Sequence, residues 1–157
     1  MPEIKTGDKA PAFCLKNEDE KDVKLDDFSG KWVVLYFYPK DSTPGCTTEA
    51  IEFTGELDNF SKLNAVVHGV SRDSAESHQK FICKQNLKVS LLTDPNHEVM
   101  EAYGVWQLKK MYGKESMGIV RSTFLIDPDG NIAHTWYKVK VEDHVAEVKK
   151  MLKELQS

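Results

Sequence analysis

Residues 32–38 read WVVLYFY, a continuous run of β-branched and aromatic side chains that ends at Pro39. A run without polar alternation is typical of a strand that is buried on both faces. A helix is predicted over residues 44–63, because apolar side chains recur there every three or four residues. Those side chains are Ala50, Phe53, Leu57 and Phe60. Residues 65–70 (AVVHGV) predict a second strand, so the three elements together predict a right-handed βαβ unit with parallel strands.

Two further helices are expected. Asp73 as N-cap, with Glu76 three residues later, matches a capping box and predicts a helix over residues 74–86. A final helix is predicted over residues 142–155. Its apolar face consists of Val145, Val148, Leu152 and Leu155.

The remaining apolar segments predict short strands. They are residues 12–15 and 23–25 around a charged turn, residues 89–93 before a helical turn, and a hairpin of residues 122–127 and 131–138. Neither repeats nor a Pro/Gly-rich linker divide the sequence. The patterns therefore predict one α/β domain over residues 1–157, with a central mixed sheet flanked by helices.

Composition argues against several classes of protein. The chain of 157 residues is 40% hydrophobic and 29% charged, as is ordinary for a soluble domain. A net charge of −4 gives no basic surface, so neither nucleic acid nor a membrane is expected as a partner. No apolar run approaches the roughly 18 residues of a membrane helix, and the N-terminus lacks an apolar leader segment. We therefore expect a cytoplasmic protein.

Three cysteines, Cys14, Cys46 and Cys83, suit a reducing compartment, because an odd number at wide spacing is a poor disulfide framework. The sequence has no CxxC pair, which argues against a thioredoxin-type dithiol and against a zinc ribbon. Its histidines are at least ten residues apart, so no local metal-binding pair exists. We expect neither a metal nor another cofactor.

The loop over residues 39–49 (PKDSTPGCTTE) lies between a parallel strand and a helix, the usual place for an active site in an open α/β sheet. Thr43 is a natural N-cap and Pro44 a natural first helical residue, which puts Cys46 in the first turn. Free N–H groups and the helix dipole there favour a thiolate. A lone cysteine at a helix start is more commonly a buried apolar residue, but the surrounding Pro, Thr and Pro-Gly favour a reactive one.

Pro39, Thr43 and Cys46 have the spacing of the peroxiredoxin signature, which this segment resembles. The surrounding FYPKDSTPGCTTEA resembles the bacterioferritin comigratory protein, or PrxQ, branch. The likeness extends to APAF (10–13), GVSRDSAESHQKF (69–81), YGKESMGIVRSTFLIDPDG (112–130) and the closing helix. It implies a thioredoxin-like fold and reduction of hydrogen peroxide or organic hydroperoxides, without flavin, haem or metal.

The resemblance also implies roles for five residues. The Cys46 thiolate would attack the peroxide and become a sulfenic acid. Arg121, the family's active-site arginine, would stabilise the thiolate and the charge that shifts across the O–O bond. Thr43 would orient the peroxide together with the Cys46 N–H, and Pro39 would form a wall of the pocket. Glu49 matches the family pattern and would orient Arg121.

Many members of the branch have a resolving cysteine five residues after the peroxidatic one, where this chain has Ile51. Some members resolve from the second helix, so Cys83 is expected to form an intramolecular disulfide with Cys46. In those members the resolving cysteine lies about one position earlier in the sequence than Cys83. One residue along an α-helix corresponds to a rotation of about 100° around its axis, so the two side chains point in different directions. Cys83 lies outside the predicted inward face of this helix and is therefore expected near the surface. That face consists of Ala75, His78, Phe81 and Ile82. Cys14 is interpreted as a structural residue of an N-terminal strand.

Thioredoxin is the expected reductant of the disulfide, with glutaredoxin or glutathione as substitutes, and the chain is expected to be a monomer. If neither remaining thiol resolves the sulfenic acid, this is a one-cysteine peroxidase that an external thiol reduces directly. A Cys–His hydrolase or acyltransferase stays open, although no feature pairs Cys46 with a particular histidine. A redox-sensing or chaperone-like module would oxidise Cys46 without turnover.

Overall fold

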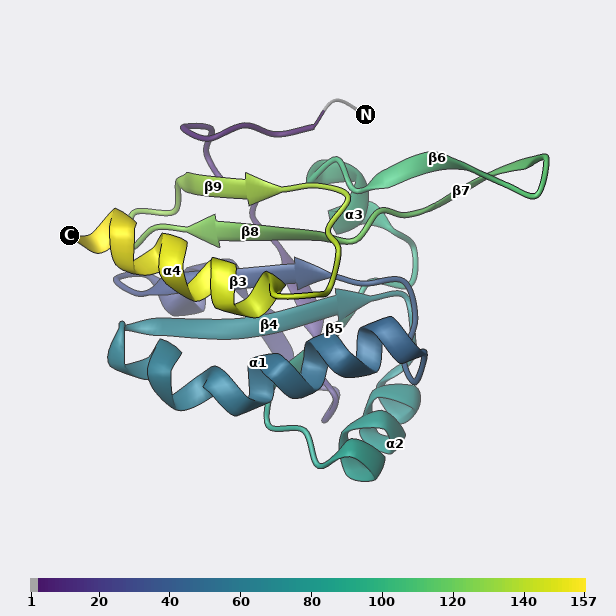
Figure 1. Ribbon diagram of the computed structural model, residues 1–157, viewed down its shortest axis with the longest axis horizontal. Helices are drawn as coiled ribbons and strands as arrows, with labels where there is room; N and C mark the ends of the chain where they lie inside the picture. Colours follow the sequence, from purple (N-terminus) through teal and green to yellow (C-terminus); the bar gives the residue numbers. More distant parts are fainter. Residues whose placement is uncertain (1–2) are drawn as a thin grey trace.

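The computed structural model describes residues 3–157, and its centre is a seven-stranded mixed sheet with the order β2-β1-β5-β4-β3-β8-β9 (Figure 1). The strands of this sheet are β1 (Cys14–Lys16), β2 (Asp22–Lys24), β3 (Trp32–Phe37), β4 (Ala65–Ser71), β5 (Ser90–Thr93), β8 (Ser122–Ile126) and β9 (Ile132–Trp136). The pairs β3–β4 and β4–β5 are parallel and the other pairs antiparallel. The predicted mixed sheet is confirmed.

Helices cover both faces of the sheet. They are the α-helices α1 (Pro44–Lys62), α2 (Ala75–Gln85), α3 (Glu98–Ala102) and α4 (His144–Gln156), and the short 3₁₀ helix η1 (Leu25–Phe28). In Figure 1, α1 and α4 lie in front of the sheet and α3 lies behind it. None of the helices among residues 3–157 combines the length and the apolar character that a membrane crossing needs.

The run at residues 32–38 forms β3, which is buried on both faces as predicted. Val34 and Tyr36 face the layer formed with α1 and α4, whereas Leu35 and Phe37 face the layer formed with α3. Successive strand side chains point to opposite faces, so a strand between two apolar layers needs apolar residues at every position. This is why the run shows no alternation.

The predicted βαβ unit is also confirmed. β3 pairs with β4 from Trp32–Ala65 to Phe37–Val70, and α1 connects the two parallel strands. The chain therefore leaves the sheet at the carboxyl end of β3 and begins α1 at Pro44. This geometry brings Cys46 to that edge of the sheet.

The capping box predicted for α2 is wrong. The N-cap is Ser74, whose Oγ accepts a hydrogen bond from the N–H of Ser77 at 3.1 Å. The Asp73 carboxylate accepts instead from Ser71 Oγ and from the N–H of Asp41, both at 2.8 Å. Glu76 points to solvent, where it pairs with a lysine one turn later. The Asp73 carboxylate therefore bonds to the preceding Ser71 and to the distant Asp41 and does not cap α2.

Two more differences concern the end of the chain and a separate ribbon. Leu155 is 38% exposed and not on the buried face of α4, because the helix runs past the edge of the apolar layer there.

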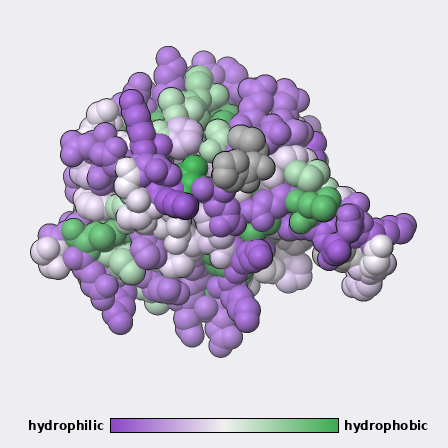
Figure 2. Space-filling model, turned by 90° about the horizontal axis from the view of Figure 1, so that it is seen from above, coloured by the Kyte–Doolittle hydropathy of each residue, from purple (hydrophilic) through white to green (hydrophobic). Residues whose placement is uncertain are grey.

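β6 (Trp106–Met111) and β7 (Lys114–Ile119) form a two-stranded antiparallel ribbon that was not predicted. The ribbon extends away from the sheet in Figure 1 and is the projection on the right of Figure 2.

Candidate active site

The loop between β3 and α1 is a tight turn. The N–H of Tyr38 still bonds to Val70 of β4 at 3.0 Å, and Pro39, which has no N–H to donate, follows. Ser42 has a left-handed conformation, with φ of 64°. Thr43 is the N-cap of α1, as predicted, but its hydroxyl donates to the carbonyl of Lys40 at 2.8 Å and caps no N–H group of the helix. The hydroxyl proton is thus engaged, while the lone pairs of Oγ1 stay available.

Cys46 is the third residue of α1 and only 1% exposed. The first-turn N–H groups of a helix have no acceptor within the helix, and they carry its positive partial charge. Gly45 lets a cation approach this turn closely, because a Cβ atom at that position would lie 3.2 Å from Nη2 of Arg121. The Pro-Gly sequence before the cysteine therefore has a steric function.

Arg121, between β7 and β8, spans the first turn of α1. Its Nη2 lies 3.3 Å from Cys46 Sγ, and its Nη1 lies 2.7 Å from Oε1 of Glu49. The structure thus brings together three residues that the sequence singled out. Burial alone would lower the pKa of Arg121, but Glu49 and Cys46 raise it overall, so the guanidinium stays charged.

Glu49 lies one turn after Cys46 and is fully buried. Burial raises its pKa to about 7, although the adjacent Arg121 opposes the rise. Its second oxygen, Oε2, has no hydrogen-bond partner among the described residues. The guanidinium thus has beside it a carboxylate that gains a proton near neutral pH.

This shift predicts a pH-dependent cost of burying Glu49. Between pH 4.5 and about 7 the folded protein holds a proton that the unfolded chain releases, so stability falls as pH rises through this window. In Glu49→Gln the side chain is neutral throughout. The free energy of unfolding of the variant, minus that of the wild type, should rise by about 2 kcal/mol between pH 5 and pH 8. Urea unfolding at both pH values measures it, and a constant difference would mean that Glu49 stays ionised.

Tyr36 is a site residue that the sequence analysis missed. Its hydroxyl is buried and unpartnered within the described chain, and burial, followed by the charges of Glu49 and Cys46, raises its pKa well above the usual value. The ring stacks on Phe53 at 4.6 Å between ring centroids. Gly69 makes room for it, since a Cβ atom there would lie 2.6 Å from the ring. The only signal in the sequence was an aromatic residue at an inward position.

The remaining candidates lie near the surface. Pro39 is exposed, and its role as a wall of the pocket stays a prediction. Cys83 is on the exposed side of α2, as its inward face predicts, and it forms no disulfide with Cys46 in this structure. Cys14 lies in β1, but its side chain is exposed and contributes to neither apolar layer. Ile51, at the position of the common resolving cysteine, is 45% exposed.

The contacts of Cys46 argue against a Cys–His hydrolase. Within residues 3–157, no histidine forms a hydrogen bond with its sulfur, so none is positioned as its general base. The same part of the chain contains no cluster of three or more His, Cys, Asp or Glu side chains that could hold a metal ion.

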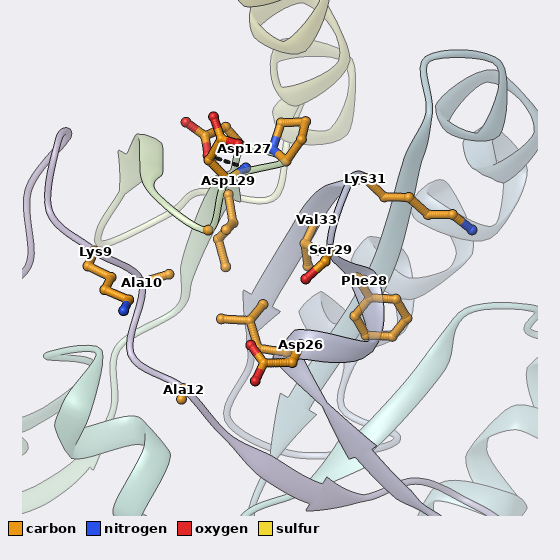
Figure 3. A pocket seen from close by; sticks show the side chains of 14 residues that line it. Lys9, Ala10, Ala12, Asp26, Phe28, Ser29, Lys31, Val33, Asp127 and Asp129 are labelled. Atoms are coloured by element: carbon orange, nitrogen blue, oxygen red, sulfur yellow. Dashed lines mark hydrogen bonds between the residues drawn. The ribbon is translucent and has the colours of Figure 1, made fainter.

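A pocket of about 310 Å³ lies at the other end of the sheet, at the start of β3 and the end of β8 (Figure 3). Lys9, Asp26, Lys31, Asp127 and Asp129 contribute charged side chains to its lining. It has neither a cysteine nor an arginine, so the chemistry of Cys46 takes place elsewhere.

Comparisons with known proteins agree with this geometry. The model of the AhpC/TSA family matches residues 6–135. Peroxiredoxin Bcp of Bacillus subtilis is 55% identical over 152 residues, which cover 97% of both chains. A mutant of Xylella fastidiosa PrxQ has a TM-score of 0.94 at 39% identity over the whole of both chains.

The Xanthomonas campestris bacterioferritin comigratory protein, described for its alkyl peroxide reduction activity, has a TM-score of 0.89 at 42% identity over 92% of both chains. The thioredoxin-like fold expected from the sequence is therefore confirmed. With this fold, and with these relatives along nearly its whole length, the chain belongs to the AhpC/TSA family as a peroxiredoxin of the Bcp/PrxQ type, a thiol peroxidase that reduces peroxides.

Proposed function

We propose that Cys46 is the peroxidatic nucleophile and that Arg121, Thr43, Pro39 and Glu49 complete its site. The observation that carries this proposal is the buried sulfur in the first turn of α1, 3.3 Å from Arg121 Nη2. A positive helix end and a fixed cation both favour the thiolate.

The thiolate attacks one oxygen of the peroxide, so an S–O bond forms as the O–O bond breaks. The sulfenic acid keeps the peroxide proton, and the leaving alkoxide or hydroxide takes up a proton from solvent and becomes an alcohol or water. Arg121 donates to the oxygens that become charged, and the Cys46 N–H orients the substrate. Thr43 Oγ1 accepts from the peroxide hydroxyl, because its own proton is held by the Lys40 carbonyl. Pro39 narrows the entrance, and Glu49 fixes the guanidinium.

Cys83 then resolves the sulfenic acid. Its thiol attacks the Cys46 sulfur, an intramolecular disulfide forms and water leaves. A disulfide requires Cα atoms within about 7 Å of each other, so the first turn of α1 and part of α2 must unwind locally. The exposure of Cys83 supports this route, because the resulting disulfide is within reach of a reductant.

Intact mass spectrometry after one equivalent of peroxide tests both steps. The wild type should lose about two mass units as a disulfide forms, whereas Cys83→Ser should gain about 16 and then about 32 as sulfenic and sulfinic acids form. Cys14→Ser is the matched control, another exposed thiol, and it should behave as the wild type.

Three results would contradict parts of the proposal. A disulfide that persists in Cys83→Ser would remove Cys83 from the role of resolver. A wild type that consumes peroxide with an external thiol, and never forms a disulfide, would be a one-cysteine peroxidase. Oxidation once per chain without turnover would identify a redox-sensing or chaperone-like module.

We infer that thioredoxin is the reductant, with glutaredoxin or glutathione as substitutes, because an exposed intramolecular disulfide is the substrate of these thiols. We infer a monomer of one domain over residues 1–157. Among the described side chains, the exposed large apolar ones are one on α1, one on α4 and three on the β6–β7 ribbon, which is less than the extensive apolar surface that an obligate dimer buries. The free thiols suit the cytoplasm.

A further inference from the structure

A buried polar network joins the loop before α1 to helix α2. Asp41, 5% exposed, accepts through Oδ1 from the Tyr38 hydroxyl at 2.6 Å and through Oδ2 from Ser77 Oγ at 2.8 Å. Its Oδ2 also lies 2.7 Å from Nδ1 of His78. The Asp41 N–H donates to Asp73, just before α2. The carboxylate thus has one partner in the loop, at Tyr38 directly after β3, and two partners on α2.

His78 is held on both sides of its ring. The side chain is fully buried, with Nε2 3.1 Å from the carbonyl of Leu92 in β5 and Nδ1 facing Asp41. A carbonyl oxygen can only accept, so Nε2 is the donor to Leu92, and Nδ1 lies at hydrogen-bond distance from the carboxylate. Removing one partner from such a buried pair leaves the other partner buried without a hydrogen bond to offset its lost hydration.

The network lies between the two segments that the disulfide step must move. Asp41 is five residues before Cys46, and His78 is five residues before Cys83 on α2. None of its hydrogen bonds within residues 3–157 involves Cys46, Glu49 or Arg121. The network can therefore influence the opening of these segments without contacting the reacting atoms.

We propose that the Asp41–His78 pair is a latch that holds the peroxidatic loop against α2 and so limits the rate at which Cys46 reaches Cys83. Asp41 and His78 are thus positioning residues of the resolving step; this rests on the proposed role of Cys83. While the latch is closed, the Cys46 sulfenic acid remains in the folded pocket. There a second peroxide can oxidise it to sulfinic acid and leave as an alcohol or water. The latch therefore sets the competition between disulfide formation and overoxidation.

Two variants at residue 78 separate the contacts of the imidazole. In His78→Gln the amide nitrogen takes the place of Nε2, so the bond to Leu92 is kept and the contact with Asp41 is lost. In His78→Asn the amide nitrogen takes the place of Nδ1 and keeps a donor for Asp41. Disulfide formation should be about tenfold faster in His78→Gln and within about threefold of wild type in His78→Asn.

The first step of the chemistry should change little in either variant. Stopped-flow measurement of sulfenic acid formation should give a second-order rate constant within about threefold of wild type. The peroxide concentration that converts half of the protein to sulfinic acid in one turnover should rise about tenfold in His78→Gln, in parallel with the disulfide rate. An unchanged disulfide rate in His78→Gln would overturn the latch.

A second pair of controls separates the latch from general destabilisation. Val148→Ala removes buried methyl groups from α4, which contributes no hydrogen bond to the network, and should lower the melting temperature without accelerating disulfide formation. Lys80→Ala changes an exposed residue of α2 itself and should change neither the melting temperature nor the rate of disulfide formation. If Val148→Ala accelerated the step as much as His78→Gln does, the effect would be general loosening and the proposal would be wrong.

Amide hydrogen exchange on the reduced protein provides a readout that needs no resolving thiol. In His78→Gln the amides of residues 41–48 and of α2 should exchange about tenfold faster, and those of α4 at the wild-type rate. If exchange accelerates but the disulfide persists in Cys83→Ser, the proposed role of Cys83 fails while the Asp41–His78 contact still controls opening. If Cys83 does resolve and exchange is unchanged, the latch alone fails.

Discussion

Replacing Cys46 with serine is expected to lower the second-order rate constant for hydrogen peroxide by a factor on the order of 10⁴ or more. A serine hydroxyl is nearly the same size, so the buried position between α1 and Arg121 should still be filled. It stays protonated near neutral pH, however, and supplies neither the thiolate nor the electrons that form a sulfenic acid. Peroxide consumption coupled to thioredoxin, thioredoxin reductase and NADPH measures the loss.

Cys14→Ser is the matched control for that experiment, because Cys14 is a free thiol outside the site. It should keep the rate constant within about twofold of wild type. The urea midpoint of Cys46→Ser should also stay close to that of the wild type, which excludes unfolding as the cause of its inactivity. Turnover of Cys46→Ser at more than a few per cent of wild type would place the nucleophile elsewhere.

Arg121→Gln is expected to have the second largest effect, a fall of about 10²- to 10³-fold in the same rate constant. The amide removes the charge that faces Cys46 Sγ at 3.3 Å and Glu49 at 2.7 Å. Arg121→Lys keeps a charge, but one ammonium group on a flexible stem cannot reproduce the planar fork that reaches both atoms, and a fall of about tenfold to a hundredfold is expected. Stopped-flow kinetics at several peroxide concentrations distinguishes the three proteins.

The loss of Arg121 also leaves Glu49 buried without its cation, which destabilises the fold. The double variant Arg121→Gln/Glu49→Gln removes both charges. It should therefore recover most of the free energy of unfolding lost in Arg121→Gln, while the rate constant stays low. If the double variant recovered the rate together with the stability, Arg121 would support the fold and not the reaction.

Local patterns predicted the parts of the fold that depend on local burial. The apolar run at residues 32–38 and the spacing of Ala50, Phe53 and Phe60 reflect which side chains are removed from water, and both gave the right elements. The position of Cys46 in its helix followed from Thr43 and Pro44, because N-cap and N1 preferences depend only on neighbouring residues.

Features that depend on distant partners could not be predicted in this way. Asp73 matches a capping box in sequence, yet its carboxylate accepts a hydrogen bond from the N–H of Asp41, 32 residues away, and only the folded chain shows this. The buried contact between Asp41 and His78 joins residues 37 positions apart. The hydroxyl of Tyr36 has no hydrogen-bond partner among the described residues, which likewise shows only in the folded chain. The β6–β7 ribbon was missed because neither face is fully covered, so its sequence has no clear periodicity.

The burial of β3 between two apolar layers keeps this strand folded when the adjacent loop opens and closes. Val34 and Tyr36 are packed against one layer and Leu35 and Phe37 against the other, so the strand cannot shift when the neighbouring loop opens. In the proposed resolving step, local unwinding would therefore stop at Tyr38, whose N–H is bonded to Val70 of β4. The intact strand would then be a template on which the same short segment refolds after every reduction, so that repeated partial unfolding would not lead to misfolding.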